Sequence, residues 1–272
     1  MTQNTRDPLA TNKAFWDYIA PVHRNSYTSI DELRSGGTGL DDIQLRELGD
    51  MHNKSVLHLQ CHIGADSISL ARLGARVTGV DYSPKSIEIA RQLNEDLHAT
   101  VTYICCDIYD LCDHLDEQFD VVYTTQGVLT WLSDIDRWAE LVACFLKPGG
   151  FLYLMDIHPI LYIFVNDTEH GLKIKFPYFT NEPFYWQDEI ADYADPKHVS
   201  DHPTFEWIWT MSDIVNSLLK NNLSLAFLNE FHKLFYRGFT TMKKDGTGWW
   251  RLPRYDKKLP LMFTLKAVKP SM

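Results

Sequence analysis

The chain has 272 residues, of which 45% are hydrophobic and 23% charged, so it can bury a large core, and the composition excludes a disordered or low-complexity protein. Its formal net charge of −10 leaves no net positive field to gather phosphates, so nucleic acid and anionic membranes are not expected as partners. One domain with an elaborate cap fits this length best.

The sequence contains no apolar window of about 18 residues, the length that spans a bilayer, and it starts with MTQNTRDPLATNK rather than with the apolar stretch of a secretory signal. We therefore expect a cytoplasmic protein. The cysteines are odd in number and form no CxxC pair, so we expect reduced thiols, mostly in the core: Cys61, Cys105, Cys106, Cys112 and Cys144. The histidines show neither HExxH nor paired Cys/His spacing, and we expect no metal site. The sequence gives no prediction of the oligomeric state.

The segment 51–158 alternates short apolar runs with longer amphipathic stretches, a pattern typical of βαβ units and of a parallel sheet covered on both faces. It predicts an α/β fold, a Rossmann-like doubly wound sheet. Ser83 and Ser133 are the expected N-caps of two helices, and residues 147–150 (KPGG) the expected turn before the last of these strands. The expected strands are 55–59, 76–81, 101–106, 119–123 and 151–155, and the expected helices 65–73, 84–97 and one that follows Ser133.

Beyond residue 158 the pattern changes, because residues 159–210 hold twelve aromatic side chains in 52 positions. So many rings indicate an ordered cap over the sheet rather than a flexible linker. A helix at 212–220 and strands at 223–231 and 261–268 follow, and these two strands can pair antiparallel around an excursion at 232–260. We divide the chain into an N-terminal helical cap (1–50), a cofactor-binding core (51–158), an aromatic-rich cap insertion (159–211) and a C-terminal segment (212–272).

In an open α/β sheet, ligands bind outside the carboxyl ends of the strands, so the residues that end each strand are candidates for the site. Asp81 ends the second strand, where a carboxylate can accept both hydroxyls of a ribose. Asp107 ends the third strand, where a carboxylate can accept an adenine amine while the backbone N–H of Ile108 donates to a ring nitrogen. The alternative for either aspartate is a strand end or helix cap without a ligand.

Taken together, five segments resemble the ordered motifs of class I S-adenosylmethionine-dependent methyltransferases: VLHLQCHIGADS, VTGVDYS, ICCDIYDL, FDVVYTTQGVLTWL and LKPGGFLYLMD. The resemblance covers about residues 55–157, and the final helix and strand pair is similar to that family's C-terminal end. It implies a seven-stranded, mostly parallel sheet with a C-terminal antiparallel pair. It also implies S-adenosylmethionine as methyl donor and S-adenosylhomocysteine as product.

The first loop departs from the family pattern. The usual form resembles VLDLGCGTG, whereas this register reads VLHLQCHIG, so that Gln60 and His62 replace glycines and only Gly64 remains. Because glycine lets the backbone approach a cofactor closely, Gln60 and His62 must either point away or make contacts with their side chains. The loop and two later segments, WLSD and LPLMFTL, are similar to a bacterial subset of the family with LQCHxGxDS in this position.

The resemblance implies which residues surround the cofactor. The methionine end would lie over the first loop and the start of the next helix, Gln126 and Gly127 would face the sulfonium, and Tyr18 would donate to the cofactor carboxylate from an N-terminal helix. The full predicted set is Tyr18, Gln60, Cys61, His62, Gly64, Asp66, Ser67, Asp81, Tyr82, Ser83, Asp107, Ile108, Gln126 and Gly127.

The methyl of a sulfonium is already activated, so such an enzyme chiefly aligns the acceptor, and it needs a base only for a protonated acceptor. His158, just after the fifth strand, is the predicted base, and its alternative is a hydrogen-bonded histidine that fixes the entry to the cap. Trp131, His158, Trp186, Tyr236 and Trp249 are predicted to contact a small-molecule acceptor, although core packing also explains the rings.

The predicted function is methyl transfer to an O or N atom of that acceptor. The alternatives are a non-catalytic protein that binds the adenosyl cofactor and a nicotinamide-dependent oxidoreductase, for which the GxGxxG turn is missing.

Overall fold

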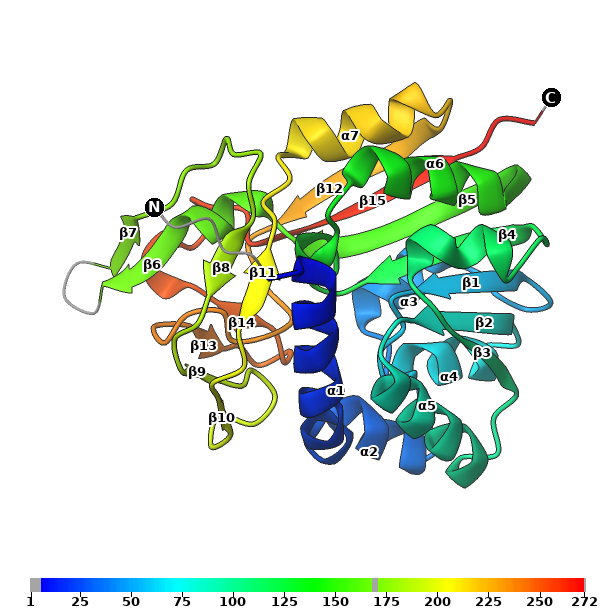
Figure 1. Ribbon diagram of the computed structural model, residues 1–272, viewed down its shortest axis with the longest axis horizontal. Helices are drawn as coiled ribbons and strands as arrows, with labels where there is room; N and C mark the ends of the chain where they lie inside the picture. Colours follow the sequence, from blue (N-terminus) through cyan, green and yellow to red (C-terminus); the bar gives the residue numbers. More distant parts are fainter. Residues whose placement is uncertain (1–5, 168–170, 272) are drawn as a thin grey trace.

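The computed structural model describes residues 6–167 and 171–271, and its centre is a seven-stranded sheet in the order β12-β15-β5-β4-β1-β2-β3 (Figure 1). Strands β1 to β5 pair in parallel, and β15 pairs antiparallel with both β5 and β12. This confirms the expected Rossmann-like fold and its C-terminal antiparallel pair. The strands are β1 (Ser55–Leu59), β2 (Arg76–Asp81), β3 (Val101–Cys105), β4 (Phe119–Thr125), β5 (Leu146–Ile157), β12 (Ser224–Phe231) and β15 (Met262–Val268).

Helices cover both faces of the sheet, with α6 and α7 side by side on one face and α4 and α5 on the other (Figure 1). Successive side chains of β1 enter different cores: Val56 packs with Ile43 and Ile68, and Leu57 packs with Trp138. This alternation is why the strands of a doubly covered sheet are apolar throughout. The helices are α1 (Pro8–Ser26), α2 (Thr28–Arg34), α3 (Asp42–Leu48), α4 (Ala65–Arg72), α5 (Pro84–Asp96), α6 (Ile135–Phe145) and α7 (Met211–Lys220).

Three details of the sequence prediction are wrong. Asp134 rather than Ser133 caps α6, because its carboxylate accepts the N–H of Arg137. The segment 147–150 is no separate turn but an irregularity inside β5, where the pairing with β4 shifts register and the Gly149 N–H donates to Lys269. The thiols are all free, as expected, but only Cys61 is buried, since the others lie on strand ends and helix surfaces.

The cap and the C-terminal excursion lie together beyond the carboxyl ends of the parallel strands, and α1 runs between them and the sheet (Figure 1). Both are built from short antiparallel pairs and single turns. These elements are η3 (Pro159–Ile163), β6 (Phe164–Asp167), β7 (Gly171–Ile174), β8 (Phe184–Trp186), β9 (Ile190–Ala191), β10 (Val199–Ser200), β11 (Thr204–Glu206), β13 (Lys243–Lys244), β14 (Trp250–Arg251) and η4 (Pro253–Tyr255). The core itself contains two further short turns, η1 (Ile108–Asp113) and η2 (Leu129–Trp131).

Helix α1 is hydrogen-bonded both to the cap and to the core. The buried side chain of Asn12 accepts the N–H of Phe205 at 2.7 Å and donates to its carbonyl at 2.8 Å. Asp17 accepts from the Ser83 hydroxyl at 2.6 Å and from the Lys85 N–H at 3.1 Å, at the start of α5. The strand ends are thus enclosed on the side of α1. Among the described residues, no helix is both long and apolar enough to cross a bilayer.

Candidate functional site

The loop after β1 keeps a glycine-like backbone without the glycines. Gln60 (φ 56°) and His62 (φ 48°) both occupy the left-handed region, as does Gly64 (φ 77°). For a residue with a Cβ this conformation costs about 1–2 kcal/mol, and the loop is held by bonds from the Cys61 N–H to Val80 and from the Gly64 N–H to Cys61, both at 2.9 Å. The departure from the family motif therefore changes the side chains and leaves the path of the backbone in place.

Asp81 holds this loop against the end of β2. One carboxylate oxygen accepts the N–H of His62 at 2.8 Å and the other accepts the N–H of Ser83 at 2.9 Å. Burial raises the pKa of Asp81 to about 6, because desolvation outweighs these two hydrogen bonds. A carboxylate offers about four lone-pair sites, so Asp81 can still accept hydroxyls of a ligand.

Asp107 lies at the neighbouring strand end, since β2 and β3 pair in parallel. Its carboxylate caps η1 by accepting the N–H of Tyr109 at 3.0 Å, and its half-buried position raises its pKa. Ile108 follows it and is buried. The sequence-predicted pair, Asp81 and Asp107, therefore lies along one edge of the sheet, although both also have the capping role that was the alternative.

Two further carboxylates lie near the end of β4. Asp66 accepts from the hydroxyls of Tyr123 at 2.8 Å and Thr125 at 3.0 Å, and Asp41 accepts from the Gln126 amide at 3.2 Å. Burial raises the pKa of Asp66 and brings that of Asp41 to about 6. Neither forms an ion pair with any residue in the described part of the chain, so this end of the site suits a positively charged ligand.

A family model described as a methyltransferase domain matches residues 56–150, the segment that contains the loop, Asp81, Asp107 and Gln126. Residues 56–150 therefore match a methyltransferase domain, within a fold shared with S-adenosylmethionine-dependent methyltransferases. S-adenosylmethionine is the cofactor of such a domain.

Curated relatives match about half of the chain. The ubiquinone biosynthesis O-methyltransferase of Nitrobacter winogradskyi is 28% identical over 52% of this chain and 54% of its own length. The enzyme of that name from Proteus mirabilis is 32% identical over 53% of this chain and 55% of its own. The chain thus spans about half the length of the curated relatives it matches.

Solved structures share the fold over a larger part of the chain. A crystal structure titled as a putative S-adenosylmethionine-dependent methyltransferase from Listeria monocytogenes has a TM-score of 0.59 and 21% identity, covering 83% of this chain and 95% of its own. A second, from Mesorhizobium loti, has a TM-score of 0.56 and 18% identity, covering 83% and 96%. These identities establish the fold alone.

The residues of the methyltransferase domain fit S-adenosylmethionine, which carries a sulfonium and an ammonium. Asp41 and Asp66 provide two desolvated carboxylates for its positive groups, since burial in a low dielectric strengthens such an attraction. The Gln60 side chain donates to the Val128 carbonyl at 3.2 Å, while its own carbonyl oxygen is buried with no partner in the described structure. An unpaired buried acceptor is suited to a ligand donor.

Helix α1 presents aromatic rings to the loop. Trp16 packs edge-on against His62 and Trp131, at 4.9 and 5.1 Å between ring centroids. Tyr18 lies elsewhere: it is 36% exposed and stacks on His202 of the cap at 3.9 Å. Residues two positions apart on a helix face nearly opposite sides, so Trp16 rather than Tyr18 lies beside the loop. A contact of Tyr18 with the cofactor stays a prediction.

The His62 ring belongs to a buried network that the sequence analysis missed. It bonds to the Ser86 hydroxyl at 2.9 Å and to His23 at 2.8 Å, and His23 bonds to Asp192 at 2.9 Å. Burial lowers the pKa of His62, so its imidazole is neutral near pH 7. The network joins α5, the first loop, α1 and the cap, and no spacing in the sequence connects these four positions.

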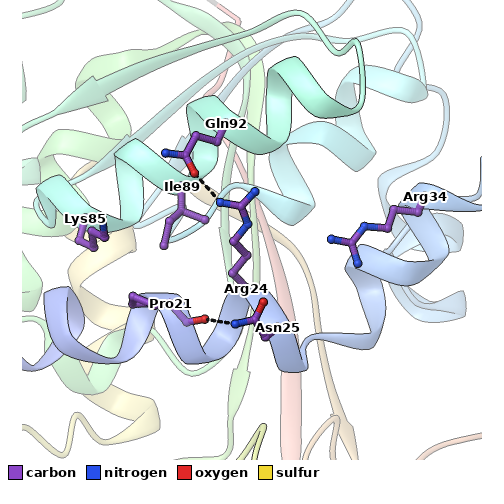
Figure 2. A pocket seen from close by; sticks show the side chains of 7 residues that line it. All are labelled: Pro21, Arg24, Asn25, Arg34, Lys85, Ile89 and Gln92. Carbon is purple, nitrogen blue, oxygen red and sulfur yellow. Dashed lines mark hydrogen bonds between the residues drawn. The ribbon is translucent and has the colours of Figure 1, made fainter.

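A cleft of about 490 Å³ lies between α1 and α5, away from the strand ends (Figure 2). Its basic side chains already have partners: Arg24 bonds to Gln92 and Asp96, and Lys85 pairs with Glu88. We therefore assign it no part in the site.

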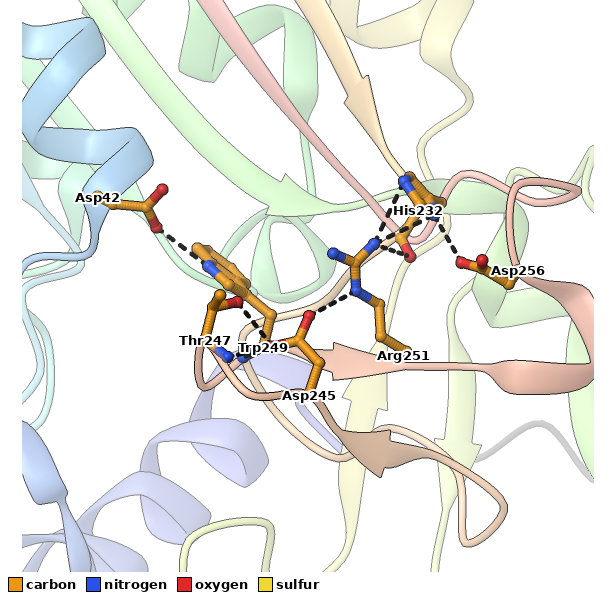
Figure 3. Close-up of polar contacts among 7 residues, drawn as sticks. All are labelled: Asp42, His232, Asp245, Thr247, Trp249, Arg251 and Asp256. Atoms are coloured by element: carbon orange, nitrogen blue, oxygen red, sulfur yellow. Dashed lines mark hydrogen bonds and ion pairs between the residues drawn. The ribbon is translucent and has the colours of Figure 1, made fainter.

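Of the rings predicted to bind the acceptor, Trp249 is structural. It is buried, and its indole N–H donates to Asp42 of α3 at 3.0 Å (Figure 3). The Lys233 ammonium lies 3.9 Å from its ring centroid. Arg251, in the same excursion, pairs with Asp245 at 2.8 Å and contacts His232 (Figure 3). The contacts of Trp249 thus join the excursion to α3, and its contact with an acceptor stays a prediction.

The other predicted rings lie nearer the strand ends. The Trp131 indole donates to the Gly127 carbonyl at 3.0 Å, and its ring stacks on Phe15 at 5.9 Å. Tyr236 packs against Tyr193 of the cap at 5.8 Å. The indole N–H of Trp186 is buried without a partner among the described residues. Contact of these three rings with an acceptor stays a prediction.

His158 has both ring nitrogens engaged. Its Nδ1 accepts the N–H of Ile160 at 3.2 Å, and its Nε2 lies 2.9 Å from the carboxylate of Glu230. The ring is 7% exposed and caps η3, the first turn of the cap. The geometry therefore favours the alternative of a histidine that fixes the entry to the cap over the predicted base.

Polar groups that the sequence analysis missed lie under the cap. A small cavity there is bounded by η2, the end of β5 and the segment before α7, and Thr130 and Tyr162 contribute hydroxyls to it. Asp156 could have been found from its place at the end of β5, by the rule that identified Asp81. No comparable sequence signal marks Glu206 or Tyr162, because both lie in the cap rather than at the end of a parallel strand. The lining residues are Leu129, Thr130, Asp156, Ile157, Pro159, Tyr162, Trp207, Trp209 and Ile214.

Proposed function

We propose that the chain transfers a methyl group from S-adenosylmethionine to an O or N atom of a small-molecule acceptor held between the sheet edge and the cap. The observation that carries this proposal is the glycine-like path of the loop at Gln60 and His62, fixed by Asp81 at the end of the next strand. The cofactor, when bound, supplies a methyl already activated for in-line displacement.

The residues of the chain then have separate tasks. Asp81 accepts from the ribose hydroxyls, and Asp107 with the N–H of Ile108 receives the adenine. Asp41 and Asp66 attract the positive end of the cofactor, and Gln126 lies beside them. Trp16 and Trp131 cover the strand ends and exclude water, so that the acceptor and the methyl meet in a dry site.

An aromatic acceptor fits the rings that surround the cap. The curated relatives are named for O-methyl transfer in ubiquinone biosynthesis, which supports a hydroxyl as one acceptor group. Since those relatives match only about half of this chain, we infer that the cap decides which acceptor is bound.

Two alternatives compete with this proposal. A nicotinamide-dependent oxidoreductase would bind a dinucleotide whose pyrophosphate is negative, which the uncompensated carboxylates of Asp41 and Asp66 disfavour. A non-catalytic adenosyl-binding protein would use the same strand-end residues, and only turnover separates it from an enzyme.

The test is calorimetric titration of the purified protein with S-adenosylmethionine, S-adenosylhomocysteine and NADH in parallel. We expect micromolar binding of the two adenosyl ligands and none of NADH. Binding of NADH alone, or of no ligand, would contradict the proposal. Formation of S-adenosylhomocysteine with a panel of phenols and amines then distinguishes the enzyme from the binding protein.

The division of the chain at residues 50, 158 and 211 and its cytoplasmic location are further predictions that accompany this proposal. Expression of residues 51–158 alone would test the first, and fractionation of cells would test the second.

A further inference from the structure

Glu206 ends the cap strand β11 at the point where the cap meets both α1 and the core. On one side of it, the backbone of Phe205 is bonded twice to Asn12 of α1. On the other side, the N–H of Trp207 donates to the Thr130 carbonyl in η2 at 2.8 Å. These bonds fix the backbone on both sides of Glu206, so its carboxyl group is held near the strand ends of the sheet.

The surroundings of this carboxyl group are acidic and phenolic. Within the described structure its one hydrogen bond comes from the Thr204 hydroxyl, at 3.4 Å, and no Lys, Arg or His pairs with it. Tyr162 and Tyr236 lie close enough to interact with it electrostatically. Burial raises the pKa of Glu206 to about 7, so the carboxyl group can gain or lose a proton near neutrality.

The neighbouring cavity has unused hydrogen-bonding groups. Thr130 Oγ1 and the Tyr162 hydroxyl are both buried and lie close enough to interact with each other, but neither has a partner at full hydrogen-bond geometry in the described structure. The cavity measures about 10 Å³, room for about one water molecule. Trp207 and Trp209 form part of its apolar wall. The cavity is therefore lined by side-chain oxygen atoms and aromatic rings, and its lining contains no cationic side chain.

Asp156 is the carboxylate that lines this cavity, whereas Glu206 lies beside it, close enough to interact with Tyr162 of the lining. The Asp156 carboxylate already has partners. It accepts the N–H groups of Val128 at 3.1 Å, Leu129 at 2.9 Å and Ile157 at 2.6 Å, and it is 1% exposed. These three hydrogen bonds from backbone N–H groups use its oxygens to hold the turn after β4 in place. Glu206 is the carboxylate that remains available to a ligand.

We propose that the methyl acceptor is an amine, and that Glu206 binds its ammonium and takes the proton that the nitrogen must lose. This inference rests on the proposed function. The ammonium N–H bond breaks and its proton passes to the Glu206 carboxylate, which leaves a neutral amine with a free electron pair. That pair forms the bond to the methyl, while the electrons of the S–CH₃ bond remain on the sulfur. The methylated nitrogen keeps a positive charge, and the Glu206 proton leaves to solvent.

The test uses three probes of similar shape: benzylamine, benzyl alcohol and benzoate. Their binding is measured by calorimetry at pH 8.5 in the presence of saturating S-adenosylhomocysteine. We expect benzylamine to bind at least tenfold more tightly than either of the others. Glu206→Gln keeps the shape of the side chain and should remove most of this preference, whereas Glu189→Gln, an exposed position of the cap, should leave it unchanged.

Several results would overturn the assignment: benzoate or benzyl alcohol binding as tightly as benzylamine, no measurable binding of any probe, or an unchanged preference in Glu206→Gln. The affinity for S-adenosylhomocysteine is measured first on the same samples. If the wild-type protein fails to bind it, the proposed function fails. If the wild type binds it but shows no amine preference, only the acceptor assignment fails. Glu206→Gln should retain that affinity, which also shows that the variant is folded.

Discussion

Nε2 of His62 lies 2.8 Å from Nδ1 of His23, so a residue of the cofactor loop is hydrogen-bonded to the helix that closes over it. In most members of the resembled family the corresponding loop position is a glycine, which has no side chain for such a bond. The bond to Asp192 extends the link into the cap. Loop, α1 and cap are therefore held together through the hydrogen-bonded imidazoles of His62 and His23.

We expect His23→Ala to weaken both folding and cofactor binding. The change removes the partner of His62 Nε2 and the partner of Asp192 Oδ2, at a cost of about 1–3 kcal/mol. Urea unfolding and calorimetry with S-adenosylhomocysteine measure the two effects. His114→Ala, at an exposed position, is the control. If His23→Ala binds S-adenosylhomocysteine as tightly as the wild type does, the histidine network does not affect cofactor binding.

Asp81→Ala should lower the affinity for S-adenosylhomocysteine by about 1–3 kcal/mol, the scale of a lost bond to a charged group. It removes both the ribose acceptor and the bonds to the His62 and Ser83 N–H groups. Asp81→Asn retains one amide oxygen as an acceptor and should lose less. If the affinity of the alanine variant is unchanged in calorimetry, Asp81 does not contact the cofactor.

Gly64→Ala should destabilise the fold more than Gly36→Ala does. A Cβ at residue 64 would lie 2.3 Å from the Tyr103 hydroxyl, whereas a Cβ at residue 36 meets nothing within 4 Å. Both glycines have positive φ (77° and 89°), so the comparison separates overpacking from backbone strain. We expect a difference of about 1–3 kcal/mol in the free energy of unfolding, measured in urea. If the two variants lose the same free energy of unfolding, the Tyr103 side chain moves aside at no cost.

We expect the Glu206→Gln variant to gain stability relative to the wild type as the pH rises from 5 to 8. The quantity compared is the free energy of unfolding. The folded-state pKa of about 7 is above the ordinary 4.5, so the folded form binds the proton more strongly. The Glu206 carboxyl group contributes about 3 kcal/mol to the free energy of unfolding below pH 4.5, and this contribution is lost as the pH rises through 7. Glutamine has no proton to lose, so the difference between variant and wild type should grow over this range in urea unfolding. A constant difference would show that Glu206 ionises normally in the folded protein.

The core of the fold was predictable because its signals are local. Alternating apolar runs, Ser83 with Pro84 at a helix start, and Asp81 and Asp107 at strand ends all depend on neighbouring residues, and the structure places these elements as expected. The errors were local as well, since both Ser133 and Asp134 can cap a helix and the structure uses Asp134.

The candidate acceptor site was predictable only in part. Tyr18 and Trp249 were chosen for their ring type, and their actual partners, His202 and Asp42, are distant in sequence. Glu206 was missed because no motif marks a carboxyl group in a cap whose neighbours come from η3 and the C-terminal excursion.

The sequence by itself determined the layered α/β architecture and the strand-end residues of the methyltransferase domain, because hydrophobic periodicity and the polarity of parallel strands act over short distances along the chain. Only the tertiary structure decided how a loop without its usual glycines keeps their backbone path, and which cap residues meet at the strand ends. Those features depend on bonds between distant segments, such as His62 with His23 and Asn12 with Phe205, and their partners are set by packing rather than by spacing in the sequence.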